Sequence, residues 1–296
     1  MTTAAPVTTA TPDEPAFPAP GDGGLVRLRL ELAYDGGQFS GWAVQPGLRT
    51  VQGVLEAALA RVLRRPVRLT AAGRTDAGVH ALAQVAHADV PEAVWFAERD
   101  RLSRRLAGVL PTDLRVTRIE EVPAQFAARA SALWRRYAYR VSDVAWGVAP
   151  LRRTDTAAWP RPLSDAVMIE ATAALLGEHD FAAFCRPRPT ATTVRTLQRW
   201  DWERDGEGVL TATLQADAFC HHMVRGLVGC LLAVGEGRHG VGFPATLLVR
   251  RERSGEFTVA PARGLTLLAV GYPEASGYAA RSAVTRARRS PPPPVR

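Results

Sequence analysis

Short segments in which every second residue is apolar recur along this chain, and they limit the folds open to it. Residues 26–32 and 114–119 both alternate in this way. A period of two predicts strands that bury one face. Between them, apolar residues repeat at helical spacing from the capping residue Thr50 to Pro66, which predicts a helix. Strands with one buried face, interspersed with helices, predict an α+β protein.

The rest of the chain adds elements of both kinds. Strands are predicted over residues 67–72, 81–87, 131–141, 194–203, 209–215 and 265–270, and helices over 93–109, 163–176 and 218–234. The segments 194–203 and 209–215 flank Asp-Gly-Glu-Gly, which predicts an antiparallel pair. The two ends are rich in Pro, Ala, Thr or Arg and are predicted to be disordered. We therefore expect a disordered extension (1–24), two α+β domains (25–122 and 123–274) and a disordered basic tail (275–296).

The charge balance of the chain favours a polyanionic partner. The net charge is +8, and all 37 basic residues are Arg. Arg can bind a phosphate through two hydrogen bonds, and a basic surface suits nucleic acid. Coding bias explains the missing Lys equally well, but it does not explain the surplus of positive charge.

Two further observations concern the compartment. No apolar run reaches the roughly 18 residues of a membrane span. Residues 1–24 contain no Lys or Arg and no apolar core, which predicts neither a signal peptide nor a transit peptide. We therefore expect a protein that does not enter a membrane.

One loop between two predicted strands combines charged side chains with glycine. It reads Gly73-Arg74-Thr75-Asp76-Ala77-Gly78-Val79-His80. Glycine permits close approach of a backbone or ligand, and loops on a rigid scaffold often carry function. Asp76, with Arg74 nearby, is therefore a candidate site. An Asp that caps a helix or closes a turn fits the same pattern, and the loop alone does not decide between them.

Three other segments join this loop in an ordered set of motifs. They are Tyr34-Asp35-Gly36 with Phe39-Ser40-Gly41-Trp42, Phe126-Ala127-Ala128-Arg129-Ala130-Ser131 with Arg135-Arg136-Tyr137-Ala138-Tyr139, and Ala218-Phe219-Cys220-His221-His222-Met223-Val224-Arg225 with Gly229. Together the four resemble the motifs of the tRNA pseudouridine synthase A family, in the same order. The resemblance covers the chain from about residue 26 to residue 273.

That resemblance implies a fold, a reaction and a partner. The fold would be two mixed domains with mostly antiparallel sheets flanking a central active-site cleft, in a homodimer. The reaction would isomerise uridine to pseudouridine at positions 38–40 of the tRNA anticodon stem-loop. It breaks the bond from ribose C1′ to uracil N1, turns the base and joins C1′ to C5, so that no atom is lost and no cofactor is needed.

The resemblance also assigns roles to three residues, beside which Arg74 is a fourth candidate. Asp76 would be the catalytic carboxylate, acting either as a nucleophile or as a base. Tyr137 would stack on the extruded uracil, although its position in a strand fits a core tyrosine too. Arg225 corresponds to a basic residue beside the catalytic Asp; a solvated helix Arg is the alternative. Arg74 would bind phosphate or occupy the space of the flipped base.

The remaining metal-ligating side chains predict no metal site. His221 and His222 fall in the predicted helix 218–234, where adjacent side chains point about 100° apart and do not easily chelate one ion. The three cysteines are odd in number and widely spaced, which predicts neither a disulfide framework nor a zinc site and leaves Cys220 as a packed thiol. We therefore expect no metal, no cofactor and a reducing compartment, the cytoplasm.

Two rival functions remain open. A non-catalytic RNA-binding protein would share the basic charge but would not need Asp76, Tyr137 and Arg225 together. A base glycosylase or nucleoside hydrolase would use a carboxylate near C1′ but would release free uracil. The isomerase leaves the mass of the nucleotide unchanged, so the products distinguish these activities.

Overall fold

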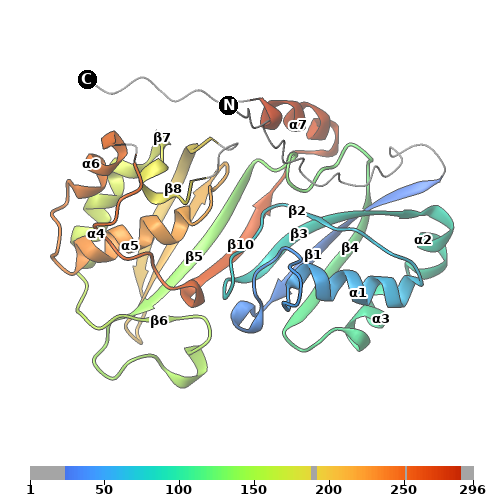
Figure 1. Cartoon of the computed structure of the whole chain (residues 1–296), viewed down its shortest axis with the longest axis horizontal. Coiled ribbons are helices and arrows are strands. Elements are labelled where there is room, and N and C mark those ends of the chain that lie inside the picture. Colours follow the sequence, from blue (N-terminus) through green and yellow to red (C-terminus); the bar gives the residue numbers. More distant parts are fainter. Residues whose placement is uncertain (1–23, 188–191, 251, 288–296) are drawn as a thin grey trace, which may run out of the picture.

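The computed structural model of the chain describes residues 24–187, 192–250 and 252–287 (Figure 1). Its strands are β1 (Leu25–Tyr34), β2 (Thr70–Ala71), β3 (His80–Pro91), β4 (Leu114–Val122), β5 (Trp134–Ser142), β6 (Ala157–Ala158), β7 (Gly177–Asp180), β8 (Val194–Arg204), β9 (Val209–Ala216) and β10 (Leu265–Gly271). Its α-helices are α1 (Val51–Leu63), α2 (Glu92–Glu98), α3 (Leu102–Val109), α4 (Asp165–Thr172), α5 (Met223–Gly235), α6 (Phe243–Arg250) and α7 (Tyr278–Arg286).

The predicted alternation places one face of each strand in the core. In β1, every second residue is buried, including Leu28, Leu30 and Leu32. Helix α1 begins where Thr50 accepts a hydrogen bond from the Gly53 amide at 3.3 Å. Its apolar stripe is buried as the helical spacing predicted.

The described strands form one large sheet in the order β4-β1-β3-β10-β5-β9-β8-β7, with β2 beside β3 and β6 beside β5. Neighbours are antiparallel except for the pairs β10–β3 and β5–β6. Figure 1 shows α1, α2 and α3 near β1, β3 and β4, and α4, α5 and α6 near β7 and β8. The predicted mixture of helices with mostly antiparallel strands is confirmed.

The last strand joins the two parts of the sheet. β10 lies between β3 and β5, although it follows both of them in the sequence by more than a hundred residues. Thr266 of β10 is opposite His80 of β3 on one side and Ala138 of β5 on the other. The segments 25–122 and 123–274 therefore contribute to a single continuous sheet.

The predicted helix over residues 93–109 is wrong in one respect, because it is two helices. α2 ends at Glu98 and α3 begins at Leu102. The residues at the break, 98–101, are all charged and offer no apolar side chain to bury. Trp95 on one side and Leu106 on the other reach the core separately.

The C-terminal tail also differs from its prediction. Residues 278–286 form α7 rather than disordered chain. Tyr278 is buried and packs against Phe126, with ring centroids 5.1 Å apart, and the Ser282 and Ser131 hydroxyls form a hydrogen bond of 3.0 Å. One apolar side chain and a few hydrogen bonds are enough to hold this short basic helix. Residues 1–23 and 288–296, also predicted to be disordered, lie outside the described residues.

None of the helices in the described part of the chain combines the length and the apolar character that crossing a bilayer requires.

Candidate active site

The loop that carries Asp76 lies between β2 and β3 and is bound to the first motif of the sequence. The Trp42 amide donates to the Thr75 carbonyl at 3.0 Å. The Thr75 hydroxyl lies 2.9 Å from the Tyr34 hydroxyl, inside the core. On the other side, the Gln84 amide donates to the Gly73 carbonyl at 2.8 Å. Hydrogen bonds on both flanks therefore fix the backbone of the loop at Asp76.

Two glycines of the first motif are needed for this close packing. A Cβ at Gly36 would lie 2.0 Å from the Val79 carbonyl oxygen. A Cβ at Gly41 would lie 2.9 Å from the Thr75 carbonyl oxygen, and Gly41 also has a φ of +93°. Side chains at these positions would push the loop away. The first motif therefore acts as a support for the Asp76 loop.

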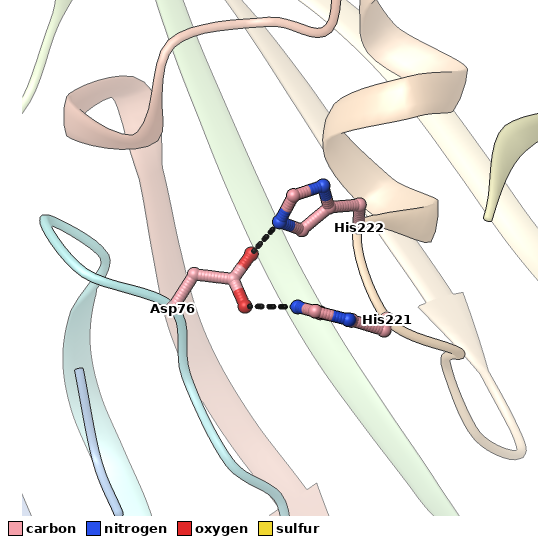
Figure 2. A group of neighbouring side chains, drawn as sticks. All are labelled: Asp76, His221 and His222. Carbon is pink, nitrogen blue, oxygen red and sulfur yellow. Dashed lines mark ion pairs between the residues drawn. The ribbon is translucent and has the colours of Figure 1, made fainter. Parts of the chain in front are cut away.

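Three basic side chains surround the Asp76 carboxylate. His221 Nε2 lies 3.4 Å from Oδ1, and His222 Nε2 lies 3.4 Å from Oδ2 (Figure 2). The Arg225 Nη1 atom lies 3.3 Å from Oδ2. The Asp76 side chain is 25% exposed, so that solvent or a ligand can reach it. The predicted proximity of Asp76 and Arg225 is thus present, and two histidines join it.

The two histidines converge because helix α5 starts later than predicted. It begins at Met223, and His222 just before it has a left-handed backbone with a φ of +67°. The argument that these side chains diverge by about 100° assumed a helix through both residues, and it is therefore wrong. One ligand atom from each of Asp76, His221 and His222 lies within 4.8 Å of the others, a spacing that one metal ion can bridge.

The electrostatic surroundings favour a neutral His222. Burial lowers the pKa of His222 below its ordinary value, while the Asp76 carboxylate acts in the opposite direction. Its Nδ1 atom is buried and has no hydrogen-bond partner among the described residues. The Nε2 atom is the one that faces Asp76.

Arg225 is held in place by a segment from near the C-terminus. Its Nε atom donates to the Ala260 carbonyl at 2.7 Å, and the Ala260 amide donates to the Arg225 carbonyl at 3.0 Å. A Cβ at Gly229 would lie 2.0 Å from the Thr258 carbonyl oxygen. Glycine at 229 therefore lets α5 lie against this segment, which orients the guanidinium toward Asp76.

A cavity of about 470 Å³ opens beside the carboxylate. The predicted site residues Arg74, Asp76, Tyr137 and Arg225 all line it. The Tyr137 ring is buried and meets the Phe219 ring edge-on, with centroids 5.2 Å apart. Burial raises the pKa of Tyr137 well above its ordinary value, so its hydroxyl stays protonated. Such a pocket has the size and polarity to hold one nucleotide base.

The structure distinguishes two tyrosines that strand spacing alone does not. Tyr137 and Tyr139 lie on one face of β5, two residues apart. Tyr137 lines the cavity, whereas Tyr139 does not and is completely buried. A Cβ at Gly264 would lie 2.8 Å from the Tyr139 ring, which shows how tightly that ring is packed.

Arg135 of the third motif is a functional residue that the sequence reasoning missed. Its buried guanidinium donates to the carbonyls of Ala72, Arg129 and Asp217 at 2.8–2.9 Å. Ala72 and Asp217 directly precede the second and the last motif, and Arg129 lies in the third. Arg135 lies two residues before Tyr137 in β5, and alternate residues of a strand share a face. This spacing could have placed Arg135 beside the candidate site.

The cysteine prediction is wrong. Cys185 and Cys220 form a disulfide, with Cα atoms 6.0 Å apart, and Cys230 is a buried free thiol. The bond joins the end of the 3₁₀ helix η4 (Ala182–Phe184) to the segment that carries His221. Sequence spacing does not reveal such a pair, because the 35-residue separation is closed only by the fold.

Comparisons with known proteins identify the family of the chain. The family model described as tRNA pseudouridine synthase matches residues 32–129 and 171–273. Three proteins named tRNA pseudouridine synthase A are similar to the chain. The one from Frankia casuarinae is 59% identical (92% of this chain, 98% of the relative), that from Streptomyces griseus 55% (91% and 96%) and that from Mycobacterium leprae 50% (90% and 96%). The chain therefore belongs to the tRNA pseudouridine synthase family.

Proposed function

We propose that the chain isomerises uridine to pseudouridine in tRNA, with Asp76 as the catalytic carboxylate. The observation that carries the proposal is the Asp76 side chain itself, which faces a base-sized cavity among three basic groups. The names of the curated relatives support the reaction and the substrate. Isomerisation needs a carboxylate that reaches the ribose and a pocket for the base, and the position of Asp76 at the cavity supports both roles.

Each of four residues that line the cavity has its own role in the proposed reaction. Asp76 acts on the ribose of an extruded uridine, either by attacking C1′ or by removing the proton of C2′. Tyr137 stacks on the uracil through its ring and donates a hydrogen bond through its protonated hydroxyl. Arg225 balances the charge of the carboxylate. Arg74, exposed at the cavity, binds a backbone phosphate or fills the space left by the base.

The proposal also covers the target position in tRNA, the domain arrangement, the oligomeric state and the compartment. The target is a uridine at positions 38–40 of the anticodon stem-loop, whose A-form helix is recognised by shape and phosphate. The segments 25–122 and 123–274 act as two domains around a central cleft, because Asp76 comes from the first and Tyr137 and Arg225 from the second. The enzyme works as a homodimer in the cytoplasm, without a cofactor.

The first experiment replaces Asp76 by Asn, which has nearly the same shape but no negative charge. We expect pseudouridine formation to fall at least about 10³-fold, the scale for losing a group that acts at the transition state. Binding of tRNA should change little, because phosphate contacts supply most of the affinity. Both are measured with an unmodified tRNA transcript, by mapping pseudouridine and by filter binding.

The same assay measures a control variant and distinguishes the proposed function from its rivals. Asp100→Asn changes an exposed carboxylate in the turn between α2 and α3 and should leave both quantities unchanged. Near-normal turnover in Asp76→Asn would remove Asp76 from the reaction. Free uracil in the wild-type reaction would favour a glycosylase, and binding without any pseudouridine would favour a non-catalytic RNA-binding protein.

A further inference from the structure

Asp76, His221 and His222 meet at a spacing that suits a metal ion. The two separations, His221 Nε2 to Asp76 Oδ1 and His222 Nε2 to Asp76 Oδ2, are both 3.4 Å (Figure 2). Two ligand atoms that each lie about 2.0–2.1 Å from a tetrahedral ion are roughly 3.4 Å apart. Each imidazole nitrogen therefore stands at this spacing from one oxygen of the carboxylate, and one ligand atom from each of the three residues lies within 4.8 Å of the others, close enough for small side-chain movements to bring them onto one ion.

The kinds of ligand select the class of ion. Two imidazole nitrogens and one carboxylate are a donor set for zinc and its neighbours in the transition series. Three protein ligands leave a fourth position for water, and all three residues line the cavity, so an ion can enter from solvent. Mg²⁺ and Ca²⁺ prefer oxygen ligands and would bind poorly here.

The backbone holds the histidines in this position before any ligand arrives. His222 is one of two non-glycine residues with a positive φ in the described part of the chain, at +67°. Such conformations are strained for a residue with a side chain and persist where the surroundings impose them. Here the Cys185–Cys220 disulfide and a 2.8 Å hydrogen bond from the Arg186 amide to the His221 carbonyl fix the segment.

Arg225 limits the strength of binding. Its Nη1 atom is 3.3 Å from Asp76 Oδ2 and would repel a cation on the same carboxylate. The guanidinium cannot move far, because its Nε atom is bonded to the Ala260 carbonyl at 2.7 Å. These charges favour a reversible site, filled when free metal rises, over a permanent structural one.

We propose that Asp76, His221 and His222 form a zinc-class metal site, and that a bound ion inhibits the enzyme by occupying the Asp76 carboxylate. The ion takes the oxygens that would otherwise act on the ribose, so metal and uridine compete. The binding half of this proposal depends only on the geometry of the three side chains. The inhibition half rests on the proposed function.

The binding test uses the full chain without RNA and without thiol reductants, which chelate zinc. Zn²⁺ is titrated by calorimetry, and Co²⁺ by the visible absorption bands of a four-coordinate ion. We expect one ion per chain. His221→Ala and His222→Asn should each weaken binding by at least about tenfold, since even the outer partners of metal ligands are worth that much. Asn is chosen at 222 because it tolerates the left-handed backbone.

A remote histidine provides the control. His239→Ala removes a partly exposed imidazole that stacks on Phe243 and should leave zinc affinity unchanged. Arg225→Gln removes the competing charge and should strengthen binding. Circular dichroism verifies that each variant is folded. No binding by the wild type, or equal affinity in His221→Ala, His222→Asn and His239→Ala, would overturn the site.

The activity test separates this proposal from the proposed function. Zn²⁺ should inhibit pseudouridine formation by the wild type, excess EDTA should restore it, and His221→Ala should need at least about tenfold more zinc for half inhibition. Binding without inhibition would overturn the competition but keep the site. A wild type that is inactive even without zinc would instead refute the proposed function, and the binding result would stand.

Discussion

At the scale of single residues, the surroundings of Asp76 come from a short stretch of the chain. His221, His222 and Arg225 lie within five residues of one another, yet they approach the carboxylate from different sides. The left-handed backbone at His222 makes this possible, since it turns the chain just before α5. The site is therefore built from one loop and one helix start, facing each other.

Tyr137 and Tyr139 provide a test at this scale. Tyr137→Phe keeps the ring in the cavity and removes only the hydroxyl, so uridine should still enter while turnover falls more than affinity. Tyr139→Phe should leave turnover within a few-fold, because its ring is packed in the core. Single-turnover formation of pseudouridine on one tRNA measures both variants. A larger loss in Tyr139→Phe would make Tyr137 a core residue.

At the scale of elements, the disulfide joins the segment that precedes β8 in the sequence to the segment that follows β9. It closes a loop of 35 residues between Cys185 and Cys220, and disulfides that close loops of this length stabilise a fold by roughly 2–4 kcal/mol. Disulfides are rare in reducing compartments, and those found there are usually redox-active. The cysteines of this chain therefore no longer argue for a reducing compartment.

Reduction of this bond gives a second test. A thiol reductant should lower the denaturant midpoint of the wild type, because the unfolded chain gains freedom. Cys220→Ser should start at the lower midpoint and should not respond to reductant. Cys230→Ala, which changes the buried free thiol, should still respond as the wild type does. If reductant shifts Cys220→Ser as much as the wild type, the bond does not contribute to stability.

His87 of β3 makes the stability of its strand depend on pH. The Ala128 amide donates to its Nδ1 atom at 3.1 Å. Burial, with a smaller effect of Arg27, lowers the pKa of His87 from 6.5 to about 4. The folded state thus favours the neutral ring, and its contribution is full above pH 6.5. It is lost as the pH falls toward 4, because the unfolded chain binds the proton first.

The loss from this one group should reach roughly 3 kcal/mol in the free energy of unfolding, at about 1.4 kcal/mol per pKa unit. His87→Gln keeps an acceptor for the Ala128 amide but does not titrate, so it should lose less stability between pH 7 and pH 4. Urea unfolding at both values measures the difference. His179→Gln, at a partly exposed position in β7, should keep the wild-type dependence. Equal losses in all three proteins would contradict the assignment.

At the scale of the whole molecule, the C-terminal elements β10 and α7 connect parts of the fold that are distant in the sequence. β10 connects the strands of the first segment to those of the second. Helix α7 then packs beside the third motif, where the Ser282 hydroxyl bonds to the Ser131 hydroxyl and the Arg281 Nε atom donates to the neighbouring Ala132 carbonyl at 3.0 Å. The C-terminal residues are therefore part of the fold rather than an appendage.

Two truncations test this role. A chain that ends at Gly277 loses α7 with the buried Tyr278 ring, and its free energy of unfolding should fall by roughly 3 kcal/mol or more. A chain that ends at Ala287 keeps α7 and should have the wild-type midpoint. Thermal unfolding of both, beside the full chain, makes the comparison. Equal midpoints for all three would mean that α7 does not contribute to stability.

The sequence by itself determined the elements and the motifs. Alternating apolar residues predicted β1, β4 and the β8–β9 pair, and the capping residue Thr50 predicted the start of α1. These features follow from local spacing, which the fold seldom overrides in long periodic segments. The order of four motifs also singled out Asp76, Tyr137 and Arg225, which line one cavity.

Only the tertiary structure decided how distant pieces meet. A period of two says which face of a strand is buried, but not which strand becomes its neighbour, so the place of β10 was hidden. The left-handed turn at His222 was hidden as well, because an apolar stripe predicted helix straight through it. Such a conformation is imposed by contacts made elsewhere, here by Cys185 and Arg186, and no local pattern records them.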